Sequence, residues 1–164
     1  MTERQKFDLV RRIGPVEIRR YHPCIVADVR VDAAYRYAAN LGFRPLVTYI
    51  SQNSIAMTAP VLQEQDETAA WIVSFVMPAG MQRADLPIPK DADISLRQIP
   101  EHTAAVLPFS GITTEAKVHE HEQELRAVLA REGIASSGPM RIARFDPPWK
   151  PGFMRYNEVI IPIA

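Results

Sequence analysis

The stretch VEIRRYHPCIVADVRV (residues 16–31) decides the fold, because the chain repeats it 78 residues later as ISLRQIPEHTAAVLPF (residues 94–109). Arg19 falls on Arg97 in this alignment. In each copy, apolar and polar residues alternate on both sides of a short polar turn, a pattern that predicts two strands. A fixed internal shift indicates one structural unit that occurs twice, so we expect a domain with pseudo-two-fold symmetry.

Each half continues with a segment of helical composition. Apolar residues recur at spacings of three and four over residues 33–51 and 114–132, and Gly133 follows the second segment as a terminator. Short runs rich in β-branched and aromatic residues predict two further strands in each half. These strands are expected at residues 55–63 and 71–77, and at residues 140–145 and 157–163.

The two halves together predict one domain of the α+β class. Half-repeats of about residues 16–78 and 94–163 each have the order ββαββ, and the proline-rich residues 79–93 connect them. We expect about eight mostly antiparallel strands to form a distorted β-barrel with two flanking helices, and successive strands to pair. With 164 residues, of which 47% are hydrophobic, the chain is large enough to fill one core.

Composition and charge argue against several functional classes. Nineteen basic and nineteen acidic side chains cancel, so neither nucleic acid nor a membrane is expected as a partner. The single cysteine, Cys24, cannot form an internal disulfide, and residues 1–15 are charged without a long apolar run. A monomer in the cytoplasm is therefore the default expectation. The sequence contains no glycine-rich phosphate loop, cysteine pair, HExxH motif or nucleophile elbow.

Two groups of segments resemble the SOUL family of haem-binding proteins. The first is NSIAMTAPVL (residues 53–62) with GFRPL (42–46) and YIS (49–51) before it, and the second is DPPW (146–149) followed by NEVIIPI (157–163). The resemblance covers nearly the whole chain from about residue 16 onward. It implies a distorted barrel of two pseudo-symmetric halves. It also implies a ligand, haem or another tetrapyrrole, that is held without covalent attachment.

The resemblance further implies a position for the ligand, against the first helix and the loop before the last strand. Apolar side chains are expected under the macrocycle and basic ones near its carboxylates. Phe43 and Val47 fall on the apolar positions, whereas Asn40 and Thr48 fall on the basic positions and carry no charge. Arg44 lies between them at helical spacing and can substitute, because a guanidinium binds a carboxylate through two hydrogen bonds.

The loop before the last strand contributes the other candidate ligand contacts. Lys150 and Arg155 are its cations, and Phe153 and Met154 are its apolar side chains. The alternative interpretation of these cations, and of Arg44, is that they are ordinary solvated side chains.

A haem iron is usually held by a histidine. His22 and His102 fall in equivalent strand turns, and His119 and His121 diverge on a helix, so none of the four is placed to share a metal. We therefore expect haem, as the one cofactor, to bind with weak or absent axial ligation. No residue requires the protein to be an enzyme.

Glu158 supports an alternative function. It lies in an otherwise apolar predicted strand, and the repeat places Ser74 opposite it. A carboxylate there is either exposed where the strand begins or turned into a cavity, a position typical of functional carboxylates. Gyrase-inhibitor-like and effector-binding domains resemble the SOUL family in fold, and in some of them a central glutamate contacts cationic drugs. The alternative is thus an effector-binding domain or a hydrolase that uses Glu158 on bulky hydrophobic or cationic small molecules.

Overall fold

The two copies of the repeated segment exchange strands with each other. In the computed structural model, which describes residues 2–164, β3 (Val16–Tyr21) pairs with β9 (His102–Ser110). In the same way β4 (Cys24–Val31) pairs with β8 (Ile94–Ile99), and both pairs are antiparallel. Each half therefore supplies a strand to the other, and the expectation that these successive strands pair with one another was wrong.

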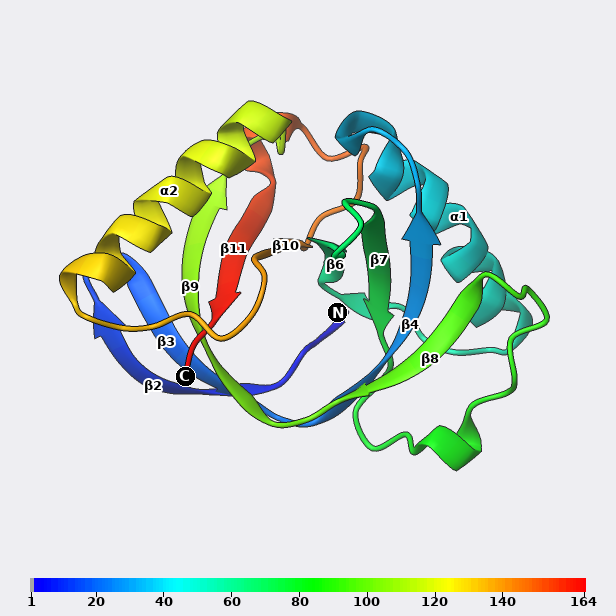
Figure 1. The fold of residues 1–164 in the computed structure, drawn as a ribbon. Coiled ribbons are helices and arrows are strands. Elements are labelled where there is room, and N and C mark those ends of the chain that lie inside the picture. The colour runs from blue at the N-terminus through cyan, green and yellow to red at the C-terminus, as the bar shows by residue number, and fades with distance from the viewer. Residues whose placement is uncertain (1) are drawn as a thin grey trace.

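Four further strands complete the repeat. β6 (Val61–Gln65) and β7 (Trp71–Val76) belong to the first half, and β10 (Arg141–Arg144) and β11 (Tyr156–Pro162) belong to the second. The order across the sheet is β2-β3-β9-β11-β10-β6-β7-β4-β8, so the two halves meet where β10 pairs with β6. The expected α+β fold of two pseudo-symmetric halves is confirmed. Its barrel is half open, because β2 and β8 are edge strands (Figure 1).

The N-terminal residues form two strands that the sequence did not predict. β2 (Phe7–Ile13) pairs with β3, and the short β1 (Glu3–Arg4) lies parallel to β5 (Thr58–Ala59). The side chains of β2 are almost all exposed. This strand therefore lacks the apolar alternation from which a half-buried strand is predicted.

Two helices cover one face of the sheet, which we call the helix face (Figure 1). α1 (Tyr35–Gln52) packs on the first half in a core with Leu46 and Phe75, and α2 (Glu115–Arg131) packs on the second half in a core with Leu125 and Val159. A smaller apolar cluster that includes Ile160 lies on the opposite face, which we call the far face. Two short 3-10 turns, η1 (Arg83–Asp85) and η2 (Gly152–Met154), lie in the connector and in the loop before β11. Neither helix of the described chain is long and apolar enough to cross a membrane.

α1 approaches the sheet most closely at Gly42. A Cβ atom at this position would lie only 2.5 Å from the Cβ atom of Val73, which is fully buried in β7. The missing side chain thus allows the helix backbone to rest directly on the strand. This close contact fixes the height of α1 over the first half of the sheet.

Substituting Gly42 with alanine tests this contact. Alanine favours a helix, but overpacking against Val73 should lower the free energy of unfolding by about 2 kcal/mol in urea denaturation. Val73→Ala makes room for the added methyl group, so the double variant should lose less stability than the two single variants together. Additive losses would show that the two positions do not touch.

Candidate functional site

α1 presents the first group of predicted ligand contacts. Five predicted residues follow one another along one side of the helix: Asn40, Phe43, Arg44, Val47 and Thr48. The three polar members are exposed, whereas the two apolar members are half-buried and pack against the core of the first half. The ring of Phe43 meets the ring of Phe75 at an angle of 63° and a centroid distance of 5.3 Å. The helix therefore brings these side chains together, with the polar groups outermost.

The loop between β10 and β11 is folded by its own polar groups. Asp146 accepts hydrogen bonds from the backbone N–H of Tyr156 at 2.6 Å and from the Lys150 ammonium at 3.0 Å. These two donors outweigh burial and hold the pKa of the Asp146 carboxyl below its usual value. The Arg155 guanidinium donates to the backbone carbonyls of Lys150 and Pro148. Both predicted cations of the loop thus help to hold its shape.

Large apolar side chains are exposed on this loop and on the segments next to it. Trp149 is 84% exposed and Phe153 is 81% exposed, and four further side chains are about half exposed. We refer to the six together as the apolar surface: Tyr37, Leu41, Ile112, Trp149, Phe153 and Met154. Exposed apolar side chains that gather in this way are typical of binding sites.

Specific contacts join the three segments that carry the apolar surface. The Tyr35 hydroxyl, in the first turn of α1, donates to the carbonyl of Thr113 at 2.7 Å. The backbone N–H of Gly111 donates to the carbonyl of Arg155 at 3.1 Å. A Cβ atom added to Gly152 would lie 2.7 Å from Ile112. Figure 1 shows the loop passing from β11 toward the start of α1.

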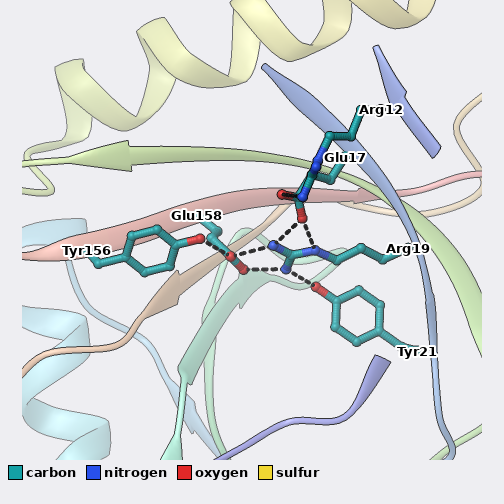
Figure 2. Close-up of polar contacts among 6 residues, drawn as sticks. All are labelled: Arg12, Glu17, Arg19, Tyr21, Tyr156 and Glu158. Carbon is teal, nitrogen blue, oxygen red and sulfur yellow. Dashed lines mark hydrogen bonds and ion pairs between the residues drawn. The ribbon is translucent and has the colours of Figure 1, made fainter. Parts of the chain in front are cut away.

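Glu158 is buried on the far face, with an exposed fraction of only 2%. The Arg19 guanidinium binds both of its carboxylate oxygens, at 2.9 Å and 2.8 Å, and the Tyr156 hydroxyl donates to one of them at 2.6 Å (Figure 2). Arg19 also binds Glu17 and the Tyr21 hydroxyl. These bonds use every N–H group of the guanidinium.

The network shifts the pKa values of Arg19 and Tyr156. Burial opposes the charge on Arg19. The hydrogen bonds that Arg19 donates to Glu158 and to the Tyr21 hydroxyl outweigh burial and raise the pKa of Arg19 above its usual value. Burial, followed by the bond to Glu158, raises the pKa of the Tyr156 hydroxyl. Arg19 therefore stays charged and Tyr156 stays protonated near neutral pH, so neither is ready to exchange a proton there.

The repeat produces a second ion pair on the far face. Arg97, which the alignment places on Arg19, binds Asp28 at 2.7 Å, and the Ser74 hydroxyl also donates to this carboxylate. One row of paired residues crosses the centre of the sheet in the order Ser74, Leu62, Ala143, Glu158. Ser74 and Glu158 are therefore counterparts in the two halves, in agreement with the alignment of the sequence.

The N-terminal residues cover part of the far face. The Arg4 guanidinium lies 4.9 Å from the ring centroid of Phe145 and 5.7 Å from that of Tyr156. The Phe7 ring lies 4.1 Å from the guanidinium carbon of Arg19. The buried ion pair is thus enclosed by aromatic rings and by the chain's own cations.

The histidines are engaged elsewhere. His22 pairs with Asp8, and His102 stacks on Tyr21 at a centroid distance of 5.3 Å. Among residues 2–164 no group of three or more histidine, cysteine, aspartate or glutamate side chains is arranged to hold a metal ion.

Sequence reasoning missed two parts of these sites. The partner of Glu158 was not predicted, although Arg19 and Arg97 are the matching charged residues of the repeat. The role of the N-terminal residues was also missed, because their contacts are made by single side chains, Arg4 and Phe7, without a periodic pattern.

The fold defines a class, the α+β half-barrels built from two pseudo-symmetric halves. The sequence model described as the SOUL heme-binding protein family matches residues 2–162, and the chain belongs to this family. A comparison with curated proteins found no match.

Solved structures of low identity share the fold. The C-terminal domain of EcmrR has a TM-score of 0.74 at 13% identity, over 91% of this chain and 96% of that one. A hydrolase from Listeria innocua has a TM-score of 0.61 at 13% identity, over 91% of each chain. SAV2435, solved with tetraphenylphosphonium, has a TM-score of 0.58 at 10% identity, over 91% of this chain and 93% of that one.

Removing Arg19 tests the buried ion pair. In Arg19→Met the Glu158 carboxylate stays buried without its cation, so the free energy of unfolding should fall by about 3–5 kcal/mol in urea denaturation. Arg20→Met is a matched control, because Arg20 is about half exposed and forms surface ion pairs, and it should cost roughly 1 kcal/mol or less. Equal losses in the two variants would contradict the central role of Arg19.

Proposed function

We propose that this protein binds haem or a related tetrapyrrole without a covalent bond and serves as a carrier or buffer for it. The apolar surface between α1 and the loop before β11 carries the proposal, because it exposes two almost fully accessible aromatic side chains, Trp149 and Phe153. Membership of the SOUL heme-binding protein family supports the class of ligand. Phe43 and Val47, at the edge of the core under the same side of α1, extend the site.

The residues present suit a flat ligand that is apolar in its body and anionic at its edge. Each square ångström of apolar surface removed from water contributes about 25 cal/mol, so contact with several aromatic side chains is sufficient for binding. Arg36 and Arg44 lie four residues apart on each side of Asn40 and are exposed, which suits a carboxylate. Lys150 and Arg155 add positive charge at the loop, and Thr48 adds a hydroxyl.

The proposed binding mode does not depend on an iron ligand from a histidine. His22 and His102 lie at the strand turns, and His119 and His121 lie on α2. None of them is on the segments that carry the apolar surface. Affinity should therefore depend mainly on the macrocycle and its carboxylates, and metal-free tetrapyrroles should bind as well.

The alternative function at Glu158 is less well supported. A structure with the same fold contains tetraphenylphosphonium, a lipophilic cation, and another is described as a hydrolase. In this chain, however, the guanidinium of Arg19 already binds both oxygens of the Glu158 carboxylate. A cationic ligand would have to displace Arg19, which is itself covered by Phe7. We therefore favour a binding protein over an enzyme.

A haemin titration tests the proposed function. Adding haemin to the purified protein should shift the Soret band and saturate at a one-to-one ratio. Replacing Trp149 and Phe153 together with serine should raise the Kd at least about tenfold, because each buried aromatic side chain contributes about 1.5–3 kcal/mol.

Ile88→Ser provides the matched control for this titration. Ile88 is 90% exposed, yet it lies in the connector between the two halves and outside the apolar surface. Its replacement should leave the Kd unchanged. The absence of a saturable change in the unaltered protein, or an equal loss in Ile88→Ser, would refute the proposed site.

A further inference from the structure

Arg144 is a partly buried cation without a carboxylate partner. It is the last residue of β10, on the helix face and beside β6 of the other half. Its guanidinium donates to three neutral oxygens: Gln63 Oε1 at 2.7 Å, Thr113 Oγ1 at 3.0 Å and the Tyr35 hydroxyl at 3.0 Å. No carboxylate of residues 2–164 forms an ion pair with it. Burial lowers the pKa of Arg144, as expected for a charge that lacks an anion.

Arg144 and its neighbour Gln63 both have N–H groups that donate to no atom of the protein. A guanidinium has five N–H groups, and only three of those on Arg144 are in use. Gln63 is fully buried, its Oε1 accepts from Arg144, and its Nε2 has no hydrogen-bond partner. A buried amide N–H without an acceptor is destabilising, because it has lost its hydrogen bonds to water. The two side chains together therefore lack an acceptor, and a negatively charged one fits best.

The pseudo-symmetry places these two residues at equivalent positions. Leu62 and Ala143 pair directly at the centre of the sheet, so the next residues along the two strands, Gln63 and Arg144, are counterparts. The scaffold is the same in both halves, but one position carries an amide and the other a cation. We call the contact between β6 and β10, where the two halves meet, the seam. On the helix face the seam therefore carries the positive charge of Arg144.

The seam lies beside the segments that carry the apolar surface. Each partner of Arg144 outside the sheet is close in sequence to an exposed apolar side chain: Tyr35 precedes Tyr37 by two residues, and Thr113 follows Ile112. Arg144 itself leads into the loop that carries Trp149. α1 also begins here, with no side-chain cap at Ala34 and no acidic residue in its first turn. The positive end of the helix dipole adds to the charge of the seam.

We propose that Arg144, together with the Gln63 amide, binds a carboxylate of the ligand whose apolar body lies on the apolar surface. This inference rests on the proposed function and gives the bound tetrapyrrole an orientation, with one propionate directed into the seam. A carboxylate has two oxygens that match the fork of a guanidinium, and it would also accept a hydrogen bond from the unpartnered amide.

Haemin and its dimethyl ester, which lacks the two negative charges, distinguish this anchor from apolar binding. The unaltered protein should bind haemin at least about tenfold more tightly than the ester, since bonds to a charged group are strong in a buried site. Arg144→Gln should bind haemin more weakly, leave the Kd for the ester unchanged and so lose most of the preference for haemin. Arg131→Gln, which removes an exposed cation from the last turn of α2, should keep the preference for haemin.

Gln63→Glu separates the binding role of Arg144 from a structural one. The new carboxylate would pair with Arg144 inside the protein and take the place of the ligand's carboxylate. This variant should unfold at a urea concentration no lower than the unaltered protein, and yet lose the preference for haemin over the ester.

The outcomes are separable. If Arg144→Gln and Gln63→Glu both keep the preference for haemin, the anchor is refuted while the apolar site stands. If Arg144→Gln does not fold, Gln63→Glu decides alone. If the unaltered protein binds neither compound, the proposed function fails and this inference fails with it.

Discussion

The rest of the structure depends on the exchange of strands between the two halves. Backbone N–H and C=O groups must be paired when they are buried, and in neither half do the first two strands pair with each other. β3 finds its partner in β9, and β4 finds its partner in β8. This pairing, with the central contact of β6 and β10, makes a single curved sheet with two unlike faces. The two faces differ in what they bury, because the helices cover only one of them.

Arg19 on the far face and Arg144 on the helix face differ in how their charges are compensated. On the far face Arg19 uses all five N–H groups, and the carboxylates of Glu17 and Glu158 compensate it. On the helix face Arg144 has only neutral partners, and the amide nitrogen of Gln63 beside it is unpaired. Arg19 thus belongs to a compensated ion pair, whereas Arg144 is a cation that lacks a carboxylate partner, which is the basis of our proposal that it binds an anion. This contrast is the reason for our proposal that the ligand binds on the helix face and not at Glu158, the alternative site that the sequence indicated.

Much of the scaffold could be predicted from the sequence, and the reasons for the remainder are physical. β7, β10, β11 and both helices were placed to within about two residues, because their apolar patterns reflect burial. β2 was missed because it buries almost nothing. The exchange of partners could not be predicted, since alternation shows which side of a strand is buried but not which strand lies beside it. The isolation of Arg144 was equally hidden, because its partners Tyr35 and Gln63 come from the other half of the chain.

Hydrogen–deuterium exchange with and without one equivalent of a tetrapyrrole tests the central claim, that the ligand binds on the helix face, most directly. With the ligand present, we expect slower exchange of the backbone amides in the first turns of α1, in residues 110–113 and in the loop at residues 146–155. Exchange in β3 and in the N-terminal strand β1, which enclose Glu158 on the far face, should not change. Protection confined to β1 and β3, with no effect on α1 or the loop, would contradict this claim.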